Sequence, residues 1–537
     1  MSTGTAAATA HVDRFVLERL PPAEHWPQIR LDESRYCYPT RLNAAAVLLD
    51  GAIERGWGQR PCMGLGDDVW SYAEVADCAN RIAAVLVEDY GVAAGNRVLL
   101  RGVNAPWMVA AWFAVLKAGA VAVTTMPLLR AAELAKVISK CEPAVSLCEA
   151  GMEAELRRAA SGPVAIWGPN GDLNTAAAAK SGKFAAVDTA ATDPALLAST
   201  SGTTGDPKVA VHFHRDLLVI ADAFEPILRA GPDDVFVGSP PLAFTFGLGG
   251  EVVFPMRAGA CTWFCDEPGP AALAELIVKR RATVCFSSPT AYRAMVALDP
   301  RPDLSSLRCG VSAGEWLPQS TFELVERELG LRLTDGIGAT ELLHIFISAA
   351  GAEIRPGSTG KPLPGWEAAI FDADGTPVPD GEAGLLAVRG PIGCRYLDDD
   401  RQTAYVRNGW NFTGDVYVRD ADGYFWYQAR ADDMIISAGY NIAAPEVEEA
   451  LLSHEAVAEA GVIGTPDAHR GMVVHAFVHL RDPSSATDPL ACELQNHVKA
   501  SIAPYKYPRR ITFCADPLPT TPTGKLQRRG LTALAGE

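Results

Sequence analysis

The chain has 537 residues, which exceeds the size at which a single hydrophobic core stops growing, so at least two domains are expected. Its formal charge of -17 repels polyanions and argues against broad binding of nucleic acids or anionic membranes. Apolar residues make up 48% and charged residues 21%, values that are typical of a globular enzyme and exclude a disordered chain.

The cysteines and the N-terminal residues both indicate a cytoplasmic protein. The twelve cysteines are scattered without CxxC spacing, which predicts reduced thiols and no structural zinc site. Residues 1–15 lack the basic and apolar regions of a secretory signal. The most apolar stretch, 105–123, is interrupted by Lys117 and Gly119, so it predicts a buried helix followed by a strand and no membrane span.

Short apolar runs alternate with helical patterns in the first part of the chain. The apolar runs lie at 97–102, 120–127 and 144–150, the helical patterns at 106–119 and 130–143, and the alternation recurs at 271–288. Because parallel strands need crossover helices, this alternation predicts an α/β fold. Residues 151–194 are rich in Ala, Gly, Ser and Asp with little periodicity, which predicts an irregular surface connection.

The pattern changes toward the C-terminus. Asp422 and Gly423 predict the turn of a hairpin within 411–430. Apolar runs then alternate with helices that begin near Pro445 and Pro489, a pattern typical of a compact α+β domain. We therefore predict a large N-terminal α/β domain of several subdomains, 1–431, and a small C-terminal α+β domain, 432–537, which the resemblance described below implies to be mobile.

The run STSGTTGDPK at 199–208 combines hydroxyls and two glycines in a loop that ends with Lys208. Glycines let backbone N–H groups approach phosphate oxygens, hydroxyls add donors, and the lysine adds positive charge. It is not a Walker A loop, because Asp206 and Pro207 precede the lysine and Val209 replaces the magnesium-binding Ser or Thr. By composition, a flexible Ser/Thr/Gly linker is an equally good interpretation.

This run resembles the phosphate loop of the adenylate-forming superfamily, which includes acyl-CoA synthetases, luciferases and the adenylation domains of peptide synthetases. Four further segments resemble motifs of that family in the family's order: DGIGATE at 335–341, FTGD at 412–415, the hinge and thiol-tunnel segment at 429–449, and PTGKLQRR at 522–529. Ala429 and Asn441 depart from the family pattern, and the second leaves the phosphate contacts of the thioester-forming state open.

The resemblance implies ATP, Mg²⁺ and coenzyme A as reaction partners and assigns roles to individual residues. Nucleotide-binding roles fall on Ser199, Thr200, Ser201, Gly202, Thr203, Thr204, Gly205, Lys208, Gly314, Glu315, Asp335, Gly336, Asp415 and Arg430. Thr340 and Glu341 are implied to hold the α-phosphate and Mg²⁺, with Glu341 as the metal ligand. Asp432 corresponds to the hinge between two domain arrangements, and Gly439 to the wall of the pantetheine tunnel.

Lys525 is implied to be catalytic together with Thr340 and Glu341. An ammonium group suits a step in which negative charge builds up between a carboxylate and the α-phosphate. Without the resemblance, the simplest interpretation is a solvated lysine without a catalytic role in the basic tail KLQRR. A carboxylate is already ionised at neutral pH, so the adenylation step needs positioning and charge neutralisation and no strong base.

The stretch at 239–250 is apolar and aromatic, unlike a site built for a charged chain. With the segments at 312–318 and 336–346, it resembles the benzoate branch of the family, and residues 11–27 resemble 2-aminobenzoate–CoA ligases. The resemblance implies that Phe246, Ile337, Gly338 and His344 surround the ring and that 2-aminobenzoate is the acid. Benzoate, another aryl acid, or transfer to the phosphopantetheine of a carrier protein are the alternatives, and the bland interpretation of His344 is a satisfied histidine at a helix start.

Two other classes of protein compete with this interpretation. The pentapeptide GVSAG at 310–314 fits the nucleophile elbow of a serine hydrolase, although that class leaves the phosphate loop and Lys525 unexplained. A regulatory protein that keeps the fold without turnover is the second, and the intact lysine argues against it. Further expected partners are a second copy of the chain in a homodimer and a downstream acyltransferase or carrier protein.

Overall fold

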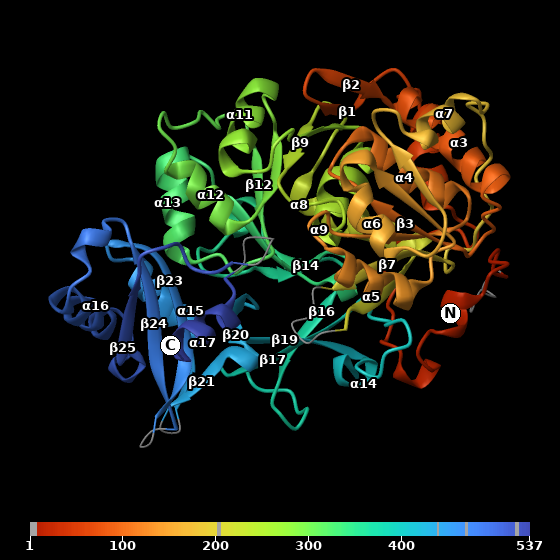
Figure 1. Cartoon of the computed structure of the whole chain (residues 1–537). Coiled ribbons are helices and arrows are strands. Elements are labelled where there is room, and N and C mark those ends of the chain that lie inside the picture. The colour runs from red at the N-terminus through yellow and green to blue at the C-terminus, as the bar shows by residue number, and fades with distance from the viewer. Residues whose placement is uncertain (1–7, 201–205, 438–439, 468–470, 521–525, 537) are drawn as a thin grey trace.

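The computed structural model describes residues 8–200, 206–437, 440–467, 471–520 and 526–536. Figure 1 shows a large N-terminal body, coloured red to cyan, with the C-terminal domain in blue at one side. The predicted fold class, a large α/β N-terminal domain followed by a small C-terminal domain, is confirmed.

The first sheet of the N-terminal domain carries the predicted βαβ pattern. Its strands lie in the order β6 (Val164–Trp167), β5 (Val145–Glu149), β3 (Arg97–Arg101), β4 (Val121–Thr124), β7 (Pro194–Thr200) and β8 (Lys208–Phe213), all parallel except β8. The crossover helices include α4 (Pro106–Lys117), α5 (Ala131–Cys141), α6 (Glu153–Ala159) and α7 (Asp172–Ala178). The stretch 105–123 is therefore a buried helix and strand, as predicted, and no helix among the described residues combines the length and apolar character needed to cross a bilayer.

The prediction for 151–194 is wrong. This stretch contains α6, β6 and α7, and β6 extends the first sheet by pairing in parallel with β5. The elements are short, with four to seven residues each, so neither the helical nor the strand period repeats enough to be seen in the sequence. Tertiary packing supplies the missing stabilisation, because Leu156, Ile166 and Leu173 are buried in the cores.

The second sheet is also built from strands that alternate with helices along the chain. Its strands lie in the order β15 (Lys361–Pro362), β14 (Ile345–Ser348), β13 (Leu333–Gly338), β12 (Cys309–Ser312), β11 (Val284–Ser287), β9 (Val235–Gly238), β10 (Cys261–Phe264), β1 (Pro61–Leu65) and β2 (Asp68–Ser71). The helices around it include α3 (Tyr72–Ala84), α8 (His214–Leu228), α11 (Pro270–Arg280), α12 (Pro289–Val296) and α13 (Gln319–Leu329). The carboxyl ends of its parallel strands β9, β11 and β12 point to one edge, where ligands bind in open α/β sheets.

An antiparallel sheet and the C-terminal domain complete the chain. The sheet contains β16 (Glu367–Phe371), β17 (Ala383–Arg389), β18 (Val406–Arg407), β19 (Trp410–Arg419) and β20 (Phe425–Arg430), and the β19–β20 hairpin has the predicted turn. The C-terminal domain contains β21 (Met434–Ser437), β22 (Tyr440–Ala443), α15 (Ala444–Leu452), β23 (Val457–Asp467), β24 (Gly471–Leu480), α16 (Asp488–Ser501), β25 (Arg510–Cys514) and α17 (Arg528–Gly536). The boundary at 431/432 stays a prediction.

Hydrogen bonds tie the C-terminal domain to the large domain in this arrangement. The Arg293 guanidinium donates to the carbonyl of Ala458 at 2.5 Å, and the backbone N–H of Ser320 donates to the Glu449 carboxylate at 3.2 Å. Ser320 lies in the first turn of α13, where the exposed N–H groups and the helix dipole favour a carboxylate. Both of these contacts between the domains are polar.

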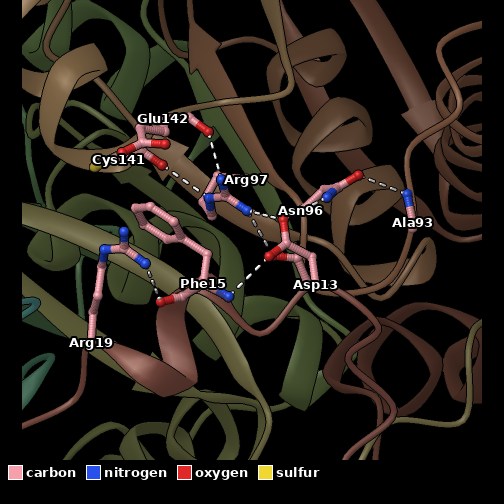
Figure 2. Close-up of polar contacts among 9 residues, drawn as sticks. Asp13, Phe15, Arg19, Ala93, Asn96, Arg97, Cys141 and Glu142 are labelled. Atoms are coloured by element: carbon pink, nitrogen blue, oxygen red, sulfur yellow. Dashed lines mark hydrogen bonds and ion pairs between the residues drawn. The ribbon is translucent and has the colours of Figure 1, made fainter.

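The N-terminal residues are anchored on the first sheet through Arg97 of β3 (Figure 2). The guanidinium of Arg97 donates to the Asp13 carboxylate and to the carbonyl of Cys141, the latter at 2.9 Å. The Phe15 ring lies between two guanidinium groups, at 4.0 Å from that of Arg97 and 3.8 Å from that of Arg19. These contacts fix the segment beside the sheet without placing it at the cavity described below.

A buried histidine predicts how stability changes with pH. His214 is fully buried, its Nδ1 accepts from the backbone N–H of Ala44 at 3.1 Å, and burial lowers its pKa to about 3. The unfolded chain binds a proton at this side chain below about pH 6.5, whereas the folded chain does not, so the unfolded state gains protons between these values.

Stability is therefore complete above pH 6.5 and is lost as the pH falls toward 3, by about 1.4 kcal/mol per pH unit for this group. Thermal unfolding between pH 7 and pH 5 should show a contribution of His214 as a falling Tm, whereas the raised pKa of Asp335 acts in the opposite direction, so only comparison with a variant isolates the histidine. His214→Asn keeps an acceptor without the basic group and should give a flatter profile; an unchanged slope would exclude His214 as a source.

Candidate functional site

A cavity of about 1040 Å³ lies at the carboxyl edge of the second sheet, between this sheet and the antiparallel sheet. It collects predicted residues from segments that are far apart in the sequence: Lys208, Phe246, Gly314, Glu315, Gly338, Thr340, Glu341, His344, Asp415 and Arg430. Asp335, Gly336 and Ile337 lie on β13 just before Gly338 and are not part of the lining. A volume of this size is sufficient for a nucleotide together with a small acid.

Several predicted residues lie outside the described residues or are described only in part. Ser201, Gly202, Thr203, Thr204, Gly205, Gly439 and Lys525 are in the first group, and only the backbone of Thr200 and Asp432 is described. The strands that flank the predicted phosphate loop are antiparallel neighbours, with Ser199 opposite Val209 and Thr200 opposite Lys208. The two ends of the loop are thus held side by side, and Lys208 at one end lines the cavity.

The segment with Thr340 and Glu341 is a short helical turn after β13 that is fixed by two residues the sequence did not indicate. His212 of β8 contacts the carbonyl of Thr340 with Nε2 at 2.7 Å. A carbonyl only accepts, so Nε2 carries the hydrogen, and burial of His212 lowers its pKa, which keeps the ring neutral. The hydroxyl of Tyr396 donates to Oε1 of Glu341 at 2.5 Å. No local motif marks either residue.

The Glu341 carboxylate fits the Mg²⁺ that the family uses. It lines the cavity, and the Tyr396 hydroxyl contacts only one of its two oxygens. The described residues include no group of three or more His, Cys, Asp or Glu that could hold a metal ion. Mg²⁺ is commonly held by one or two carboxylates together with nucleotide phosphates and water, a role that the second oxygen of Glu341 fits.

Asp415 and Arg430 lie opposite each other on the β19–β20 hairpin. The guanidinium of Arg430 donates to the Asp415 carboxylate at 3.0 Å and to the carbonyl of Thr413 at 3.1 Å. The arginine thereby fixes one oxygen of the carboxylate and leaves the other available to accept a hydrogen bond. Gly414, with a φ of 80°, makes room for this arginine, because a Cβ there would lie 3.1 Å from Nη2 of Arg430.

His344 stands among aromatic rings at the apolar part of the cavity. Its ring centroid lies 4.6 Å from that of Phe254, 5.6 Å from Phe246, 5.8 Å from Phe224 and 6.2 Å from Phe286. Leu343 directly before it has a φ of 70°, a conformation rare for a branched side chain, by which the chain reverses after the turn. A Cβ on Gly249 would lie 2.3 Å from the imidazole, so this glycine is needed for the histidine to fit.

The two ring nitrogens of His344 are poorly hydrogen-bonded for a buried histidine. Nε2 has a long contact of 3.4 Å to the carbonyl of Phe246, and Nδ1 has no hydrogen-bond partner in the described part of the chain. Burial lowers the pKa of His344 to about 3, so the ring is neutral at physiological pH. Nδ1 is thus a buried acceptor without a partner among the described residues, which is rare in folded proteins.

Asp335 and Ser312 do not have the surroundings of a metal ligand or a nucleophile. Burial raises the pKa of Asp335 to about 8, so this carboxyl is largely neutral at pH 7 and is suited to exchange hydrogen bonds with a neutral group. Ser312 lies within strand β12 and is fully buried, whereas a nucleophile elbow exposes its serine on a sharp turn. The geometry thus gives no support to a serine hydrolase.

Comparisons with known proteins match nearly the whole chain. Residues 52–395 match the family described as AMP-binding enzyme, and residues 446–525 match the AMP-binding enzyme C-terminal domain. The benzoate–CoA ligase of Thauera aromatica is 33% identical over 507 residues, which are 91% of this chain and 95% of that protein.

Two solved structures are similar over the same extent. The anthranilate CoA ligase AuaEII, in complex with anthranoyl-AMP, is 30% identical with a TM-score of 0.89 and coverage of 94% of this chain and 99% of that chain. A benzoate CoA ligase from Burkholderia xenovorans is 31% identical with a TM-score of 0.84, over 91% and 99% of the two chains. The chain therefore belongs to the adenylate-forming superfamily of AMP-binding enzymes, in its family of AMP-forming acyl-CoA and aryl-CoA ligases.

Proposed function

We propose that this ligase activates an aromatic carboxylic acid, with 2-aminobenzoate as the preferred acid, and transfers the acyl group to coenzyme A. The observation that carries the proposal is the neutral imidazole of His344 inside an otherwise apolar, aromatic part of the cavity. The names of two similar proteins, an anthranilate CoA ligase and a benzoate–CoA ligase, support an aromatic acid.

In the first step a carboxylate oxygen of the acid attacks the α-phosphorus of ATP, the bond to the bridging oxygen breaks, and pyrophosphate leaves. Lys208 and Thr340 line the cavity and can hold phosphate oxygens, while Lys525 neutralises the carboxylate and the α-phosphate as charge builds up. Glu341 would hold Mg²⁺, which supplies charge neutralisation on the phosphates. Asp415 and Arg430 orient the ribose.

In the second step the thiol of coenzyme A attacks the carbonyl carbon of the mixed anhydride. The thiol loses its proton, the bond to the phosphate oxygen breaks, and AMP leaves. The proposed hinge at Asp432 changes the arrangement of the C-terminal domain between the steps, and Gly439 keeps the pantetheine path open. The polar contacts of Arg293 and Ser320 to this domain are of a kind that such a movement can break and restore.

Hydrogen bonding at His344 favours an acid with an ortho donor. Nε2 faces the carbonyl of Phe246 and carries the hydrogen, so Nδ1 is the acceptor and suits an amino group. The same group in a purely apolar pocket would lose its hydrogen bonds to water without replacement. A benzoate ring lacks the donor and would leave Nδ1 without a partner.

The test is a product analysis with purified protein, Mg·ATP and a panel of benzoate, 2-aminobenzoate, salicylate and a fatty acid, each with and without coenzyme A. We expect an aryl-CoA thioester and AMP, with the highest kcat/KM for 2-aminobenzoate. A higher kcat/KM for benzoate would refute the ortho-donor assignment. An aryl adenylate that accumulates in the presence of coenzyme A would indicate another acceptor, such as a carrier protein, and a product from the fatty acid only would refute the aryl assignment.

A further inference from the structure

Tyr396 is a fully buried residue beside the nucleotide part of the cavity. Its backbone is fixed on strand β8, because the N–H of Val211 donates to the carbonyl of Arg395 at 2.8 Å and the N–H of Leu397 donates to the carbonyl of Val209 at 2.9 Å. The ring of Tyr405 packs against that of Tyr396 with centroids 5.7 Å apart. Backbone and ring are thus both held in place.

This tyrosine contacts two charged groups that line the cavity, although it is not part of the lining itself. Its hydroxyl donates to Oε1 of Glu341 at 2.5 Å, and the ammonium of Lys208 lies over its ring at 5.5 Å from the centroid. A hydrogen bond to a carboxylate and a cation–π contact are both favourable interactions. Tyr396 therefore contacts a negative and a positive group of the proposed phosphate and metal site.

Glu341 and Lys208 carry opposite charges, and both contact Tyr396. Side chains of opposite charge that approach the same ring attract each other. If they paired, the carboxylate could no longer bind Mg²⁺ and the ammonium could no longer bind phosphate. The hydroxyl of Tyr396 satisfies one carboxylate oxygen and fixes the direction of the other.

We propose that Tyr396 is a positioning residue that holds Glu341 in the orientation required for Mg·ATP and keeps it from pairing with Lys208. The backbone of the turn is held separately, through the contact of His212 with the carbonyl of Thr340. Loss of the Tyr396 hydroxyl therefore frees the carboxylate side chain and leaves the turn in place. The inference rests on Glu341 as the ligand of Mg²⁺, which belongs to the proposed function.

The test compares ATP binding by calorimetry in saturating Mg²⁺ and in EDTA for the full chain. Tyr396→Phe removes only the hydroxyl, and we expect the Kd of Mg·ATP to rise about tenfold, the size of one hydrogen bond to a charged group, with the Kd in EDTA unchanged. The Mg²⁺ concentration for half-maximal ATP–pyrophosphate exchange should rise by about the same factor, and the KM of the acid should stay within about twofold.

A double-mutant comparison separates positioning from a structural effect. If Tyr396 acts through Glu341, Tyr396→Phe should have no further effect on the Kd of Mg·ATP in a Glu341→Ala background. Tyr72→Phe is the matched control, because it removes another buried hydroxyl, which donates to the carbonyl of Ala260 at 2.7 Å in a distant core. It should leave both Kd values unchanged.

Two outcomes would overturn the inference: an unchanged Kd in Tyr396→Phe, or additive losses in the double variant. A further outcome, in which Glu341→Ala does not weaken Mg·ATP binding, would instead refute the metal ligand itself. The failure of the inference and the failure of the proposed function are thus distinguishable.

Discussion

Replacement of Lys525 by alanine is expected to slow formation of the acyl adenylate by about 10²–10³-fold, the effect of removing one preorganised group that stabilises transition-state charge. The ammonium neutralises the carboxylate and the α-phosphate as they approach each other. No base is needed, because the carboxylate is already ionised. Thioester formation from a preformed adenylate should stay within a few-fold, because coenzyme A attacks after the phosphate bond has formed. ATP–pyrophosphate exchange and single-turnover transfer from synthetic aryl-AMP measure the two steps separately.

The described residues on both sides of 521–525 support the choice of this variant. Thr520 and Leu526 form a β-bridge, and the N–H of Gln527 donates to the carbonyl of Pro519 at 2.8 Å, so the ends of the segment are held together independently of the lysine side chain. Lys499→Ala on exposed helix α16 is the matched control and should leave both steps unchanged. Equal losses in the two steps of Lys525→Ala would show that the lysine acts on binding or on folding and has no special role in adenylation.

His344→Phe should lower the preference for 2-aminobenzoate over benzoate, measured as the ratio of kcat/KM values, by about 10–100-fold. Phenylalanine keeps an aromatic ring within the cage of Phe246, Phe254 and Phe286, so little cavity is created. It removes the Nδ1 acceptor, and an amino group in the pocket then loses its partner. Benzoate makes no such bond and should retain its kcat/KM within a few-fold.

Benzoate in the same variant is the internal control for folding and for adenylation. An equal fall in kcat/KM for both acids would indicate that His344 serves only for packing. A fall for benzoate only would contradict the direction of the proposed hydrogen bond. Salicylate provides a third comparison, because its hydroxyl is also an ortho donor. Its kcat/KM should fall together with that of 2-aminobenzoate.

Local patterns in the sequence determined the fold class, the order of the domains and many of the groups in the cavity. Alternating apolar runs and helical patterns predict parallel strands, because the spacing of apolar residues follows the period of the strand or helix that contains them. The motifs around Lys208, Glu341 and Asp415 carry chemistry in a few consecutive residues, so they can be recognised before the chain is folded. The same dependence on local periodicity explains the wrong prediction for 151–194, where the elements are too short to show a period.

Tertiary structure alone decided which side chains support those groups. Tyr396 contacts Glu341 across 55 positions of the chain, and His212 contacts Thr340 across 128. The aromatic cage of His344 likewise comes from helices and strands that the sequence does not mark as neighbours. Such contacts depend on strand order and side-chain direction, which are set when distant segments pack together. The sequence by itself therefore determined the chemistry that is available in the cavity, and only the packing of distant segments decided how that chemistry is oriented.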